Sequence, residues 1–178
     1  MEFSQSLERG MFYHKDAIAF GREIEMKYTL FYNFVLITSS QLRLENFEHI
    51  FISRHITDIH IMKTANYCPN FLPLYLYPET NEQLTTDLIQ ERVSNLNLEI
   101  VNKIANELNL KSTIEKADCV VPRNDFAPKD ILGYIYAVLH APNYNEKYRE
   151  FLKIDFPKIQ YPKNIKTFWN VVALGSQI

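Results

Sequence analysis

The strongest constraint on this fold is a predicted helix at residues 128–140 that a proline brings to a stop. Pro128 suits the first helical position, and Asp130 is favourable in the first turn. Pro142 removes a backbone donor and biases the preceding residue away from helical torsions, so the helix ends near His140. Apolar residues recur at helical spacing and commit one face to a core: Ile131, Leu132, Ile135, Val138 and Leu139.

A second helix is predicted at residues 144–153, directly after this stop. Asn143 or Asn145 is expected to cap it, because amide side chains accept from the free N–H groups of a first helical turn. The two helices therefore make a tight corner. A narrow apolar stripe lies between the charged residues of the second helix: Tyr148, Phe151 and Leu152.

Four stretches upstream have the pattern of β-strands. Residues 28–38 are aromatic and β-branched without a breaker, which predicts one buried strand or two short ones. Residues 49–54 and 58–62 alternate between apolar and polar, as half-buried strands do. Residues 71–77 predict a further strand, in which Pro73 indicates an edge or a bulge because proline cannot donate to a ladder.

Two more helical regions complete the pattern. Residues 82–110 hold two amphipathic patterns, the first of which ends at Val93. A final helix at residues 165–174 is expected to be capped by Asn164 at its start and by Gly175 at its end.

These elements predict an α+β domain, with a mainly antiparallel sheet in the N-terminal half and helices concentrated in the C-terminal half. The domain is expected to occupy residues 28–178, after an uncertain lead-in at residues 1–27 that has no firm period. Apolar residues make up 47% of the chain, which is ample for a core. With no bilayer-spanning apolar run and no secretion signal, we expect a cytoplasmic protein, in which Cys68 and Cys119 are buried thiols.

The charges are unevenly distributed along the chain, although the net charge is only -2. Residues 79–118 hold eight acids and four bases, whereas residues 143–166 hold six bases and three acids. The second region therefore suits contact with a polyanion and the first does not.

Catalytic motifs are weak or missing. With four glycines, the chain has no glycine-rich phosphate loop. Asp16, Glu25 and Lys27 fit the spacing of a magnesium nuclease only loosely, and a solvated charged face explains them better. His55 points away from Asp58 and His60 if these residues form a strand, so we expect no metal site there. We interpret the three residues as part of a polar strand edge.

The segment from Asp130 into residues 153–159 (KIDFPKI) resembles a stretch that follows the adenine methyltransferase domain in type ISP and related single-chain restriction-modification enzymes. Residues 35–41 (VLITSSQ), 51–58 (FISRHITD) and 72–78 (LPLYLYP) are similar to the same family in the same order. The resemblance spans residues 33–175 and implies a specificity, or target-recognition, segment that binds double-stranded DNA.

The same resemblance implies that catalysis belongs elsewhere in a larger parent chain, relative to which both ends of this chain are expected to be truncated. The cofactor turn and the acidic or amide motif of an adenine methyltransferase are absent, so the segment is not expected to be an enzyme by itself. S-adenosylmethionine would bind the methyltransferase domain of the parent, and no cofactor is expected here. The alternative is a structural segment that packs the methyltransferase domain and touches DNA little.

Candidate DNA contacts follow from side-chain chemistry. Arginine reads guanine, asparagine reads adenine, and lysine or arginine neutralises phosphates. The candidate readers are residues of expected loops, with two neighbours at the start of the second helix of the corner. The loop residues are Arg54, Lys63, Asn66, Arg123, Asn124 and Asn143, and the neighbours are Tyr144 and Asn145. The candidate backbone anchors lie in the basic region: Lys147, Arg149, Lys153, Lys158, Lys163 and Lys166.

Overall fold

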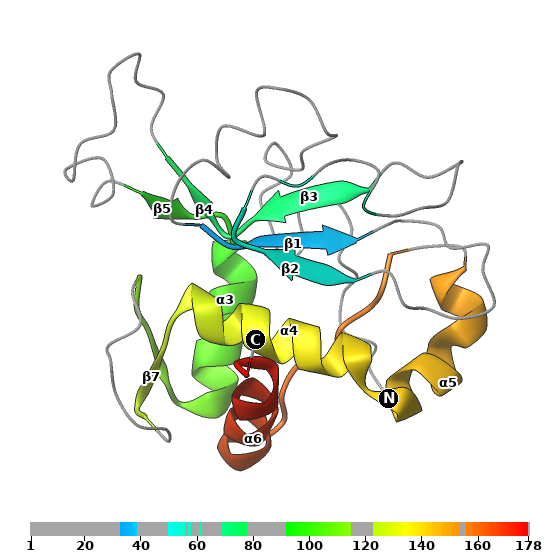
Figure 1. Cartoon of the computed structure of the whole chain (residues 1–178). Helices are drawn as coiled ribbons and strands as arrows, with labels where there is room; N and C mark the ends of the chain where they lie inside the picture. Colours follow the sequence, from blue (N-terminus) through cyan, green and yellow to red (C-terminus); the bar gives the residue numbers. More distant parts are fainter. Residues whose placement is uncertain are drawn as a thin grey trace.

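The computed structural model describes residues 33–38, 50–55, 57, 61, 69–77, 92–114, 123–153 and 156–177. Within these residues the fold is α+β, with strands in the first half and helices mostly in the second, as expected (Figure 1). The predicted lead-in at residues 1–27 and both cysteines lie outside the described residues, as does the predicted strand at 58–62 except for Ile61, which is not in a strand.

A three-stranded antiparallel sheet forms the first layer. Strand β1 (Val35–Thr38) pairs with β2 (Phe51–Ser53) on one side and with β3 (Asn70–Pro73) on the other. The antiparallel sheet is therefore confirmed. Pro73 lies in β3, at an edge of the described sheet, as its missing N–H requires.

The predicted strand at residues 71–77 is interrupted at Leu74. Beyond it, β4 (Tyr75–Leu76) leaves the first sheet and pairs with β5 (Val93–Ser94). The sequence predicts that Val93 ends a helix, and this prediction is wrong because Val93 lies in strand β5. Tertiary pairing is the reason, because Val93 lies opposite Leu76 and the Asn95 amide donates to the carbonyl of Pro73 at 2.7 Å.

Helix α3 (Leu98–Leu108) confirms the second half of that prediction. It begins where the Asn97 side chain accepts from the N–H of Glu99, and it ends where Asn109 adopts a left-handed φ of 52°. A short parallel pair follows, formed by β6 (Lys111–Ser112) and β7 (Asp125–Phe126), and leads the chain into the helical corner.

The helices of the C-terminal half are α4 (Pro128–His140), α5 (Pro142–Leu152) and α6 (Ile165–Gly175), which confirms their predicted positions. The predicted cap of α5 is wrong, because that helix begins at Pro142 and has Ala141 at its N-cap without a side-chain hydrogen bond. Proline already fixes the first helical torsion there. Asn164 does cap α6, accepting from the N–H of Thr167 at 2.7 Å.

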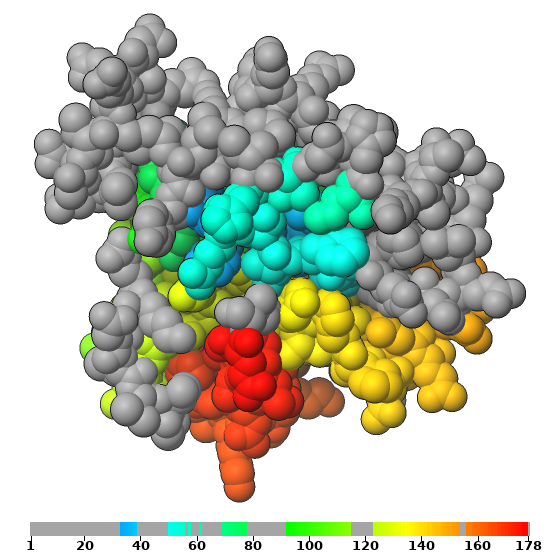
Figure 2. Space-filling view, in the orientation of Figure 1, coloured from blue at the N-terminus to red at the C-terminus, as the bar shows by residue number. Residues whose placement is uncertain are grey.

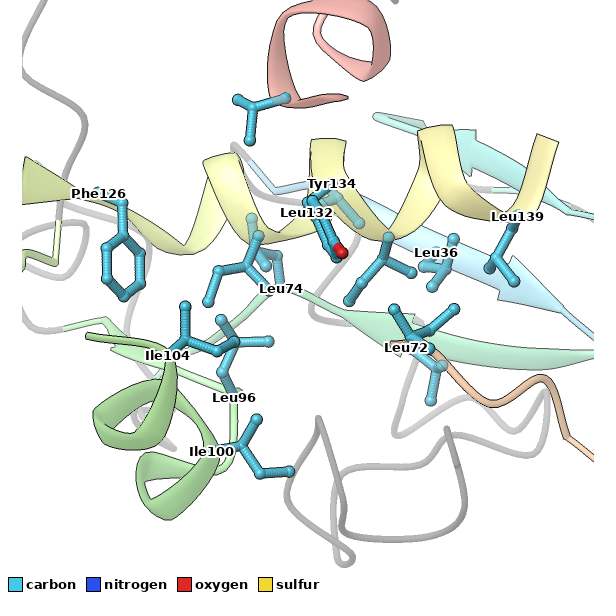
Figure 3. Close-up of a cluster of buried hydrophobic side chains, with 14 of the residues drawn as sticks. Leu36, Leu72, Leu74, Leu96, Ile100, Ile104, Phe126, Leu132, Tyr134 and Leu139 are labelled. Atoms are coloured by element: carbon cyan, nitrogen blue, oxygen red, sulfur yellow. The ribbon is translucent and has the colours of Figure 1, made fainter. Parts of the chain in front are cut away.

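Helix α4 lies at the centre of the domain, between the sheet and α6 (Figure 1). Figure 3 shows Leu36 and Leu72 of the sheet beside Leu139, while Ile104 of α3 lies below the N-terminal half of α4. The other face of the sheet is buried too, through Val35, Ile37 and Phe71. Burial on both faces of the sheet explains why residues 35–38 have no polar alternation, whereas residues 28–32 of the predicted strand lie outside the described residues.

Gly175 is not the predicted C-terminal cap. It is the last residue of α6 and packs directly on α4, where a Cβ added to it would lie 1.9 Å from the carbonyl oxygen of Gly133. Ser176 follows as the cap residue. The glycine is therefore needed for close approach of two helices.

Candidate functional site

Three tyrosines hold the segment after α5 against the helical corner. The hydroxyl of Tyr134 donates to the carbonyl of Gln160, and that of Tyr144 donates to the carbonyl of Lys158, both at 2.8 Å. The Gln160 amide donates in turn to the hydroxyl of Tyr148 at 3.0 Å. This lysine-bearing segment, predicted to be extended, therefore has a fixed path beside α4 and α5.

Burial disfavours ionisation of these phenols. It raises the pKa of Tyr134 to about 12 and the pKa of Tyr144 further, the latter also because of Tyr148. Both hydroxyls therefore stay protonated and keep donating at neutral pH. Tyr144 is buried, so the structure assigns this predicted base reader to the positioning of Lys158.

The candidates on α5 face solvent among acids. Asn143, Lys147 and Arg149 are exposed, and Asn145 is half-buried. The ammonium of Lys153 lies 2.8 Å from Glu150, and its hydrogen bond holds the pKa of that carboxyl below the usual range. Lys158 lies with its ammonium 4.4 Å from the ring centre of Phe151. The structure therefore brings α5 and Lys158 together as one mixed-charge surface.

Arg123 has a different position from the one expected of a base reader. It is buried, its guanidinium donates to Asp130 at 2.5 Å, and it lies 5.4 Å from the ring centre of Trp169. The same Asp130 oxygen accepts from the N–H of Ala127, which satisfies a free donor at the start of α4. This ion pair links the connector before β7 to α4 and α6.

Beside that ion pair is a hollow of about 510 Å³ between the connector and α6. Asn124, Lys166 and Asn170 line it and are exposed. The remaining lining residues are Arg123, Ile165, Trp169 and Ala173. None of these side chains is acidic, and the exposed Lys166 makes the hollow suitable for an anionic group, whereas the charge of Arg123 is offset by Asp130.

Arg54 and Lys129 meet over one aromatic ring. The guanidinium of Arg54 lies 4.4 Å from the ring centre of Phe34, and the ammonium of Lys129 lies 4.9 Å from it. Lys129 was not singled out from the sequence, where it was only one charge in a first helical turn. A cation–π neighbour is a tertiary feature that spacing along the chain does not reveal.

Figure 2 shows β2, α4, α5 and the C-terminal end of α6 on one face of the molecule. Lys163 and Lys166 are exposed next to the start of α6. Lys63 and Asn66 lie outside the described residues, as do Asp58, His60 and the three residues of the nuclease spacing. No helix in the described part of the chain is long and apolar enough to cross a membrane.

A family model described as "Type ISP C-terminal specificity domain" matches residues 7–178. No curated protein matches the chain. Two of the solved structures that match this chain show the same fold. The cryoEM structure of a DrdV–DNA complex is 21% identical with a TM-score of 0.56, and covers 81% of this chain and 11% of that chain.

The second structure is the ATP-dependent Type ISP restriction-modification enzyme LlaBIII bound to DNA. The two chains are 20% identical with a TM-score of 0.54, and the matched region covers 82% of this chain and 8% of the LlaBIII chain. The chain thus spans about a tenth of the length of these structural neighbours.

Proposed function

Because this chain belongs to the Type ISP C-terminal specificity domain family, we propose that it binds double-stranded DNA and contributes to target recognition in a restriction-modification enzyme. The family match over residues 7–178 is the observation that carries the proposal. The structural neighbours, both described as DNA complexes, support it.

The exposed cations supply the chemistry that duplex DNA requires. Phosphate contacts fix orientation and give most of the affinity, and they need lysine or arginine at the surface. Lys147, Arg149 and Lys163 are exposed and suit this role, as do Lys166 beside the hollow and Arg54 beside β2. The buried Arg123 and Tyr144 act by holding the elements that carry these cations.

We propose that bond making belongs to another domain. That domain would be an adenine-N6 methyltransferase of the parent chain, acting in the cytoplasm on an adenine flipped out of the duplex. We propose that S-adenosylmethionine binds that methyltransferase domain and not this chain. The contribution of this chain is to place the duplex.

A packing role is the second candidate function. Large apolar side chains are exposed on several elements, including Leu98 at 70% and Leu174 at 66%. Such side chains suit contact with a methyltransferase domain or another part of a parent protein. A protein contact through them would depend little on salt.

Selection of bound duplexes from a randomised pool, followed by anisotropy across a salt series, tests the proposal. Phosphate neutralisation predicts an affinity that falls steeply as salt rises, and target recognition predicts enrichment of a short motif. Absence of binding at low salt would contradict the proposal and favour packing. Binding without enrichment of a motif would mean that the chain contacts only the sugar-phosphate backbone of DNA.

A further inference from the structure

We propose that the outer face of α6, together with Asn124, reads base pairs in the major groove, with Lys166 anchoring the adjacent phosphate. This inference rests on the proposed DNA-binding function and assigns base reading to a specific surface. The surface consists of Asn124, Lys166, Asn170 and Ala173.

The geometry of α6 presents these side chains together. Its inner face is buried on α4 through Phe168, Trp169 and Val172. Lys166, Asn170 and Ala173 are spaced four and three residues apart, so they form one row along the helix, and all three are exposed. The row is fixed in position because the inner face is anchored in the core.

Asn124 joins this row from another part of the chain. The hollow of about 510 Å³ separates the connector from α6, and Asn124 lines it opposite the helix row. The connector is held in place because Lys111 donates its N–H to the carbonyl of Asn124 at 3.0 Å, and because Arg123 pairs with Asp130. Two amides on rigid supports therefore face one space.

The charge of this surface suits a polyanion. No acidic residue follows Asp155 in the sequence, whereas Lys158, Lys163 and Lys166 do. Within the described residues, no carboxylate pairs with Lys163 or Lys166. A duplex approaching α6 therefore meets two lysines that no described carboxylate pairs with, although Asp125 of β7 follows Asn124, and these lysines favour phosphate over an acidic or neutral protein surface.

The remaining side chains match base edges. Asparagine makes a bidentate contact with the N6 and N7 atoms of adenine, and the alanine methyl suits the methyl group of thymine. Asn170 and Asn124 are the amides that can supply the first contact, and Ala173 can supply the second. We therefore expect A·T pairs in the part of the motif that α6 reads.

Repeating the duplex selection with Asn170→Ala and Asn124→Ala tests the inference. The wild-type chain should enrich a motif with at least one A·T pair. In each variant, the preference for A·T over the other base pairs should fall about tenfold at one such position. Asn102→Ala is the matched control, because Asn102 is an exposed asparagine on α3. The control should select the wild-type motif.

A motif that Asn170→Ala and Asn124→Ala both leave unchanged would overturn the inference while the proposed function stands. Binding of the wild-type chain without any enriched motif would overturn it in the same way. Absence of binding by the wild-type chain would instead contradict the proposed function itself, so the two failures are distinguishable.

Trp169 gives an independent readout of where the DNA lies. It is the chain's single tryptophan, it lines the hollow, and its buried Nε1 has no hydrogen-bond partner among the described residues. Binding of a selected duplex should shift its indole resonance in an NMR titration, and Lys166→Ala should weaken that titration severalfold. An unchanged indole resonance at saturating duplex would place the DNA elsewhere and contradict the inference.

Discussion

Helices α5 and α6 both pack against α4, and the basic region at residues 143–166 covers most of α5 and reaches the start of α6, yet the surfaces of the two helices differ. The surface of α5 mixes bases with Glu146 and Glu150, and Lys153 is paired with one of them. The surface of α6 has no acid. A count of basic residues along the sequence therefore overestimates the cationic surface wherever carboxylates lie one helical turn away.

Removal of Asp130 should have the largest effect, and it acts on the α6 side. Asp130→Ala leaves the buried guanidinium of Arg123 without its carboxylate, which costs about 3–5 kcal/mol. Urea unfolding followed by circular dichroism measures this loss. Glu150→Ala breaks the exposed pair on α5 and should leave the midpoint unchanged. Equal shifts for the two variants would contradict the account.

The contact between α4 and α6 should be the next most sensitive. Gly175→Ala places a methyl group against the backbone of Gly133, and such overpacking costs about 1–3 kcal/mol. Thermal unfolding measures the effect. Leu174→Ala changes an exposed neighbour on the same helix and should shift the midpoint little. A wild-type midpoint for Gly175→Ala would mean that the two helices are not in close contact.

The buried tyrosines that hold the segment after α5 should instead make the domain less stable in alkali. The raised pKa of Tyr134, about 12, means that the folded state keeps a proton that the unfolded chain releases near pH 10. This stabilisation is complete below pH 10 and is lost as pH rises toward 12, by at most about 1.4 kcal/mol per pH unit. Urea midpoints measured between pH 9 and 12 test this.

Tyr134→Phe removes one of the two buried phenols with a raised pKa and should make the alkaline decline less steep, while Tyr144 still contributes. The variant lowers stability at neutral pH by about 1 kcal/mol through the lost hydrogen bond to Gln160. Tyr136→Phe, which removes a half-buried phenol from the same helix, is the matched control for the loss of a tyrosine. A Tyr134→Phe curve as steep as the wild-type curve would mean that this phenol is not responsible.

Helical spacing and proline positions were enough to predict α4, α5 and α6, because these signals are local. The cap of α6 by Asn164 followed from the same chemistry. The roles of Val93 and Gly175 were not predictable in this way, since one depends on pairing with β4 and the other on the approach of α4.

The candidate site was predicted only in part. Residue type pointed to a basic region at residues 143–166, but it could not show that Arg123 is buried against Asp130 or that Tyr144 donates to the carbonyl of Lys158. Lys129 and Asn170 were not selected, because their relevance depends on neighbours from distant segments. Burial and contacts between distant segments of the chain therefore distinguish the residues that position others from the exposed residues, which composition alone does not do.

The slope of log affinity against log salt for a duplex measures how many phosphates the lysines near α6 neutralise compared with those on α5. We predict that Lys163→Ala with Lys166→Ala reduces the slope by about 2, since each phosphate contact contributes about 0.9. Lys147→Ala with Lys153→Ala on α5 should reduce it by less than about 1, because neighbouring carboxylates already offset these cations. A larger reduction from the α5 pair than from the α6 pair would contradict the account.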